Sequence, residues 1–113
     1  MTIAMTLIAI LKERAKKTKA LREDALKEAK RLVLLLKNRF EFETVYICGS
    51  LLSGKFGPHS DIDMVIKGSK MEDFFKVYAL LIKESKYKID LKPFEDMMED
   101  FKEKVLTEGM KIG

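Results

Sequence analysis

The chain has 113 residues, with 22 lysines and arginines against 18 aspartates and glutamates, and 47% of the residues are hydrophobic. This length predicts one domain, residues 1–113, whose core needs neither disulfides nor a structural metal. No apolar run reaches the roughly 18–20 residues of a transmembrane helix, and no cleavage-like site follows residues 1–11, so we expect a cytoplasmic protein without membrane contact. The single cysteine, Cys48, lies in an apolar run and predicts a buried, unreactive thiol.

The N-terminal segment, residues 1–38, is predicted to be helical, because apolar residues recur at helical spacing through residues 2–37. Its polar middle, residues 14–20, leaves two possibilities: two helices, or one long helix that projects beyond the core and packs on a partner. Residues 12–39 are strongly basic, which fits contact with nucleic acid or an acidic partner, although a solvated helix face is the commoner meaning. The acidic segment after Pro93 suggests a self-complementary or partner-facing surface, so a homodimer is possible.

Residues 39–113 are predicted to form the core. Short β-branched and apolar runs indicate strands over residues 44–48, 61–67 and 86–92. Helical spacing indicates helices over residues 71–85 and 94–108, with Gly109 as the natural end of the second. The first of these is expected to turn five residues inward: Phe74, Phe75, Tyr78, Leu81 and Ile82. Strands separated by helical patterns predict a small α/β (α+β) fold, a mixed sheet flanked by helices.

Acidic residues on two of the predicted strands suggest a metal site. Asp61 and Asp63 are two positions apart, so they project from the same side of their strand, and their mutual repulsion favours a cation between them. Asp90 lies on the next strand, and it joins the pair if the two strands are neighbours. Three carboxylates in one place suit two magnesium ions (Mg2+), which bind carboxylate oxygens and substrate phosphates.

A glycine and a serine stand at the end of the strand over residues 44–48. Gly49 lets the backbone approach a phosphate, and Ser50 adds a hydroxyl donor at the start of a helical turn. Lys55 is within reach as a further phosphate contact, although an exposed side chain is the commoner role. The glycine and lysine positions of a P-loop also match residues 49–55, but Phe56 stands where that loop needs a serine or threonine.

Each aspartate taken alone has an ordinary structural explanation. Asp61 follows a loop and suits a turn, Asp63 can be a polar strand position, and Asp90 can be a charge that protects an edge strand from aggregation. The three aspartates together, with Gly49 and Ser50 one loop upstream, favour the metal-dependent interpretation.

The spacing of these residues resembles the minimal nucleotidyltransferases of the DNA polymerase beta superfamily. The similarity covers residues 39–91 and consists of Gly49-Ser50, the string Ser60-Asp61-Ile62-Asp63, and a later strand with Asp90. It implies a mixed sheet flanked by helices, with Asp61, Asp63 and Asp90 as catalytic magnesium ligands. It also implies that Gly49 and Ser50 bind an NTP, commonly ATP. Many relatives carry an arginine where this chain has Ser53.

Small members of this superfamily resemble the antitoxin half of pairs with a HEPN-domain ribonuclease. The resemblance therefore implies magnesium-dependent transfer of a nucleoside monophosphate, AMP, from an NTP to a hydroxyl, including a tyrosine of such a partner. The alternative is a non-enzymatic antitoxin or nucleotide-binding module that acts by contact with its partner.

Overall fold

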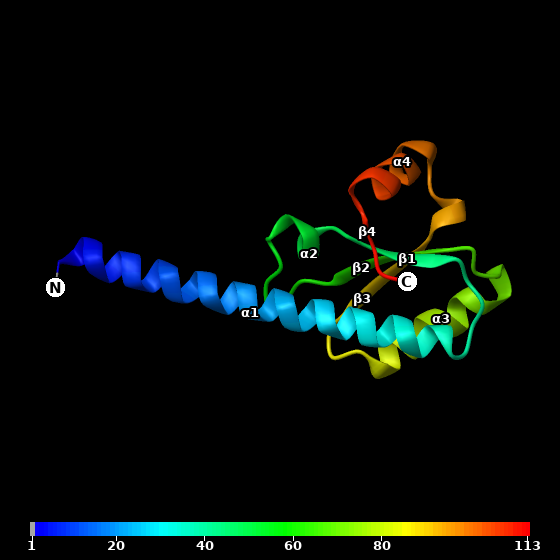
Figure 1. Ribbon diagram of the computed structural model, residues 1–113, viewed down its shortest axis with the longest axis horizontal. Coiled ribbons are helices and arrows are strands. Elements are labelled where there is room, and N and C mark those ends of the chain that lie inside the picture. The colour runs from blue at the N-terminus through cyan, green and yellow to red at the C-terminus, as the bar shows by residue number, and fades with distance from the viewer. Residues whose placement is uncertain (1) are drawn as a thin grey trace.

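The computed structural model, which describes residues 2–113, contains one sheet of four strands (Figure 1). The strands are β1 (Thr44–Cys48), β2 (Ile62–Lys67), β3 (Ile89–Pro93) and β4 (Met110–Lys111). Their order is β3-β2-β1-β4, with β2 and β3 parallel and the other two pairs antiparallel. The predicted mixed sheet is confirmed, whereas β4 was not predicted, since two residues are too short to show a period.

Helix α1 (Ile3–Lys37) is continuous over 35 residues. Thr2 caps its start by accepting a hydrogen bond from the Met5 amide. The polar middle does not break it, because alanine, lysine and arginine are strong helix formers. The helix packs on the sheet only through its C-terminal half, and residues 3–20 project past the sheet into solvent (Figure 1). The structure therefore has one long helix that projects beyond the core, while its packing on a partner stays a prediction.

Helices α1 and α3 (Met71–Glu84) cover one face of the sheet and bury the main core. Alternate strand residues face these helices, among them Val45, Ile47, Met64 and Leu91. The prediction that Phe75 and Ile82 face inward is wrong, since both are well exposed. The inward face of α3 is centred on Val77 and Leu81, and the helix carries more apolar residues than this face can accommodate.

One charged side chain is buried in this layer. Glu28 of α1 accepts hydrogen bonds from Arg31 Nε at 2.6 Å and from the Lys86 backbone amide at 2.8 Å. Arg31 also donates to the Glu84 carbonyl at the end of α3. Glu28 therefore joins α1 to the segment between α3 and β3, and the hydrogen bond from Arg31 lowers its pKa.

The opposite face of the sheet carries a smaller cluster made of Tyr46, Val65, Phe94 and Val105. It is covered by a 3-10 turn, η1 (Phe94–Asp96), and by α4 (Glu99–Glu108). The single helix predicted over residues 94–108 is therefore interrupted, because Met97 and Met98 have extended backbones.

Helix α4 ends before Gly109, as predicted, and lack of space for a side chain explains why this residue is a glycine. A Cβ at Gly109 would lie 2.5 Å from the Val105 carbonyl oxygen, while its φ of −69° is ordinary. Within residues 2–113, the helices lack the combination of length and apolar composition that crossing a bilayer requires.

Candidate active site

The face of the sheet opposite α1 and α3 brings the candidate residues together through strand register. Cys48 of β1 pairs with Asp63 of β2, and Asp63 pairs with Asp90 of β3. The next pair on this face is Val65 and Lys92. Because side chains alternate along a strand, these residues project away from the main core. The expectation that the third predicted strand lies beside the second is confirmed, and it makes Asp63 and Asp90 neighbours.

Asp63 is the carboxylate of this site whose pKa is raised. Burial raises its pKa, the charge of Asp90 raises it further, and Asp61 adds a smaller effect in the same direction. Lys92 opposes these effects, and its Nζ donates to Asp90 Oδ2 at 2.8 Å. That hydrogen bond raises the pKa of Lys92. The site is therefore an acidic pair held beside one lysine.

Asp61 stands apart from this pair in the structure. It precedes β2, is exposed, and does not line the cleft described below. Among residues 2–113, no three histidine, cysteine, aspartate or glutamate side chains are grouped closely enough to form a ready metal site. Asp90 instead bonds to Lys92. The assignment of Asp61, Asp63 and Asp90 as metal ligands thus stays a prediction.

The donor set nevertheless suits a hard cation. Carboxylate oxygens are the ligands that magnesium prefers, and the repulsion that raises the pKa of Asp63 is relieved by any cation placed beside it. The Asp63 carboxylate lies close to the backbone at Gly49, because this residue has no side chain. A Cβ at Gly49 would overlap with the Asp63 carboxylate, and its φ of 69° favours glycine as well.

The predicted turn after β1 is the short helix α2 (Ser50–Ser53), which begins directly after Gly49. Leu51 is fully buried and fixes the turn to the core. Arg22 of α1 holds it from outside, since its Nε donates to the Leu51 carbonyl at 2.6 Å. Ser50 is therefore presented toward the cleft by a turn that the core and α1 both hold in place.

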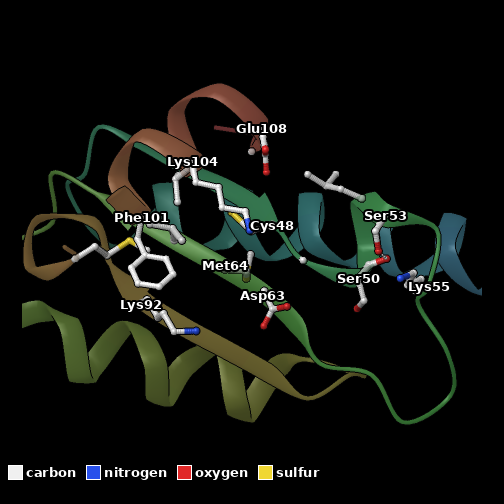
Figure 2. A pocket seen from close by; sticks show the side chains of 16 residues that line it. Cys48, Ser50, Ser53, Lys55, Asp63, Met64, Lys92, Phe101, Lys104 and Glu108 are labelled. Carbon is white, nitrogen blue, oxygen red and sulfur yellow. Dashed lines mark hydrogen bonds between the residues drawn. The ribbon is translucent and has the colours of Figure 1, made fainter. Parts of the chain in front are cut away.

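A cleft of about 720 Å³ opens above Asp63, between α2 and α4. Figure 2 shows the Asp63 carboxylate between Ser50, Ser53 and Lys55 on one side and Lys92 and Phe101 on the other. The residues that line the cleft are Cys48, Gly49, Ser50, Leu52, Ser53, Lys55, Asp63, Met64, Val65, Lys92, Met97, Phe101, Lys104, Val105, Glu108 and Gly109. Gly49, Ser50 and Asp63 thus share one cavity, whereas Asp61 and Asp90 are not among the residues that line it.

Three cleft residues were missed by sequence reasoning: Lys92, Phe101 and Lys104. Lys92 had a readable signal, since it is two positions after Asp90 and therefore projects from the same side of the strand. Phe101 and Lys104 had none, because only the packing of α4 brings them over the sheet. Cys48 also lines the cleft, and burial raises the pKa of its thiol.

Phe56 has a structural role that agrees with the rejection of a P-loop. Its ring is fully buried and lies edge-on to Tyr87, with ring centroids 5.7 Å apart. The residue that replaces the P-loop hydroxyl is thus a core side chain that faces away from any ligand.

Comparisons with known proteins agree with the fold described above. The family model described as polymerase beta, nucleotidyltransferase matches residues 30–112. Among solved structures, the chain is similar to one described as a toxin-antitoxin with AMP-PNP, with a TM-score of 0.63 and 20% identity over 76% of this chain and 72% of that chain. A comparison with curated proteins finds no match.

Proposed function

Because this chain belongs to the polymerase beta nucleotidyltransferase family, we propose that it transfers AMP from ATP to a hydroxyl group, with magnesium as cofactor. One observation carries the proposal. Asp63 and Asp90 are neighbours in the sheet register, and Asp63 lies against Gly49 of the glycine-serine turn in a cleft large enough for a nucleotide.

The three aspartates would act through magnesium in this reaction. Asp61 and Asp63 would both hold the metal, and Asp90 would complete the ligand set or assist the acceptor hydroxyl. Bound magnesium would neutralise charge on the phosphates and lower the pKa of the attacking hydroxyl. In the transfer, the acceptor oxygen bonds to the α-phosphorus, the bond to the β-phosphate oxygen breaks, pyrophosphate leaves, and the hydroxyl proton passes to Asp90 or solvent.

Gly49 and Ser50 bind the β- and γ-phosphates. The absence of a side chain at Gly49 leaves room for the Asp63 carboxylate beside the turn, and Ser50 lies in the cleft wall. Lysines take over the charge that an arginine at position 53 would supply. Lys55 borders the phosphate side of the cleft, and Lys104 enters it from α4. A lysine binds phosphate as a point charge without the two-pronged geometry of arginine.

The proposed acceptor is a tyrosine hydroxyl on a HEPN-domain partner. The similar solved structure is a toxin-antitoxin pair with AMP-PNP, an ATP analogue. This supports ATP as donor and a toxin as partner. A cleft open to solvent, with no acceptor-binding domain in residues 2–113, also suits an acceptor presented by a second protein.

The test is transfer of label from α-labelled ATP to a HEPN-domain partner in the presence of magnesium. Asp63→Asn removes one charge with little change in shape, so we expect transfer to fall at least ~1000-fold, as for the loss of a principal electrostatic group. Asp100→Asn, on the exposed surface of α4, is the matched control and retains full transfer. Equal labelling by wild type and Asp63→Asn would refute the assignment.

A second candidate is an antitoxin that acts by contact alone. It is favoured by Ser53 at the arginine position and by the bond between Asp90 and Lys92. It predicts that wild type transfers no label, and that the triple variant Asp61→Asn, Asp63→Asn, Asp90→Asn still binds the partner with unchanged affinity.

A further inference from the structure

The N-terminal half of α1, residues 3–20, is an arm that projects past the sheet. Every residue in it is exposed. Four large apolar side chains on the arm, Ile3, Leu7, Ile10 and Leu11, are between 43% and 82% exposed. Figure 1 shows the arm extending well beyond the sheet.

Four apolar residues of the arm, Ile3, Leu7, Ile10 and Leu11, continue the face of α1 that packs on the core, whereas the exposed Met5 and Ile8 point in other directions. Leu7 precedes the buried Ala25 by about five turns, at about 3.6 residues per turn, so both point in the same direction. Leu11 stands in the same relation to the buried Ala29. The arm thus carries a packing stripe, defined as Ile3, Leu7, Ile10 and Leu11, with no sheet beneath it.

A lone helix of this length gains little from its own hydrogen bonds. Helices of this size are marginal in water, and most helical stability in proteins comes from burying an apolar face. The stripe is also bordered by positive charge, since Arg14 and Lys17 follow on the same side of the helix. The arm therefore suits a surface that is apolar and acidic.

The chain itself carries such a surface on η1 and α4. Met98, Phe101 and Leu106 are more than half exposed there. The acidic residues beside them are Glu95, Asp96, Glu99, Asp100 and Glu103, and all five are exposed. We call this surface the acidic patch. The acidic patch offers apolar residues for the stripe to pack against and negative charges that can pair with Arg14 and Lys17.

The arm cannot reach the acidic patch of its own molecule. Helix α1 packs on one face of the sheet and α4 on the other, and the arm extends away from the sheet (Figure 1). The arm is about 27 Å long at 1.5 Å per residue, which exceeds the roughly 15 Å of α4. We propose that the arm docks on the acidic patch of a second copy of this chain, in a two-fold dimer.

Reciprocal docking explains both surfaces better than pairing of two arms. In a two-fold dimer the contact forms twice, which doubles the buried area toward the 1,200 Å² or more that stable interfaces bury. Two arms alone would share one short stripe and leave the acidic patch exposed. Because α4 forms one wall of the cleft, docking also places the partner's arm at the edge of the active site.

Sedimentation velocity on the full chain tests the stripe. Wild type is expected to be a dimer at micromolar concentration, and Leu7→Glu is expected to raise the dimer dissociation constant at least tenfold. Met5→Glu is the matched control, because Met5 is 59% exposed against 55% for Leu7 but lies on the opposite side of the helix. Both variants should keep the wild-type circular dichroism. A monomeric wild type, or equal effects of the two variants, overturns the proposal.

Charge reversal tests the partner surface. Arg14→Glu with Lys17→Glu, and separately Glu99→Lys with Glu103→Lys, should each give monomers, because the arm and patch then carry like charges. An equimolar mixture of the two double variants should restore a dimer, since both contacts regain opposite charges. If the variant Glu99→Lys with Glu103→Lys remains a dimer, the two arms pair with each other and the proposal is overturned. Monomeric wild type that binds single-stranded RNA through Arg14 and Lys17 assigns the arm to nucleic acid and overturns it as well.

Discussion

The two faces of the sheet differ in what covers them, and the difference separates stability from chemistry. One face is sealed by α1 and α3 over an apolar layer, while the other carries Asp63, Asp90 and Lys92 at an open cleft. The same strands supply both faces, because side chains alternate along a strand. A polar residue can therefore enter every second position without disturbing the core.

Two carboxylates, one on each face, have pKa values shifted in opposite directions. Glu28, under the sealed face, has a lowered pKa because Arg31 bonds to it. Asp63, at the open face, has a raised pKa because it is partly buried beside Asp90. Glu28 stabilises the fold in its charged form, whereas the charge of Asp63 opposes folding and favours a bound cation.

The largest effect on stability is expected in the sealed layer. Leu36→Ala should lower the free energy of unfolding by about 2–5 kcal/mol, because it leaves a cavity at a fully buried position. Leu34→Ala is the control on the same helix, where the side chain is 64% exposed, and it should cost less than about 0.5 kcal/mol. Urea unfolding measures both values. Similar losses in the two variants would mean that α1 packs on the sheet differently.

Glu28→Gln is expected to cost about 1–3 kcal/mol at pH 7, because it breaks a buried, charge-assisted network. The folded pKa of Glu28 lies below the ordinary 4.5, so its stabilisation is present above pH 4.5 and is lost as the pH falls through the folded value. Unfolding at pH 7 and in the acid range should therefore show a smaller acid loss in the variant. Glu41→Gln, an exposed position, should leave the pH profile unchanged.

Gly49→Ala sharpens the comparison on the open face. Gly54 has a left-handed helical backbone, where alanine should cost about 1–2 kcal/mol, whereas Gly49 has a φ of 69° and a ψ of −144°, outside that region, so alanine there should cost more. A Cβ at Gly54 meets open space, whereas at Gly49 it overlaps with Asp63. We expect calorimetry to show that Gly49→Ala alone loses ATP binding. Equal ATP affinity in the two variants would contradict the role of Gly49.

The smallest expected change in stability has the opposite sign. Asp63→Asn should raise the free energy of unfolding at pH 7 by up to about 1 kcal/mol, since it removes a like charge beside Asp90. Because the pKa of Asp63 is raised in the folded protein, the native state binds this proton more tightly than the unfolded chain does. The contribution of Asp63 to stability is therefore greatest below its ordinary pKa of 3.8 and falls as the pH rises through the folded value. The gain over wild type should disappear in acid. A destabilised variant at pH 7 would show that Lys92 already compensates the pair.

Much of the site could be predicted because its signals are local. Asp63 and Asp90 can be recognised in the sequence because each is an acidic residue within an apolar strand, and Gly49 comes where a strand ends in a turn. Asp61 lies before β2 and is not among the residues that line the cleft, so its role as a metal ligand stays a prediction. The inward placement of Phe75 and Ile82 is wrong, because periodicity identifies an apolar helix but the neighbouring layer decides which part of it is covered.

The sequence by itself determined the alternation of β2 and β3 and the glycine at the turn, because strand period and backbone sterics act over a few residues. Only the tertiary structure decided that Asp90 bonds to Lys92 beside Asp63 and that Phe101 and Lys104 line the cleft. It also decided that the arm is exposed along its length. These features depend on which elements pack together, and packing joins residues whose separation along the chain carries no periodic signal.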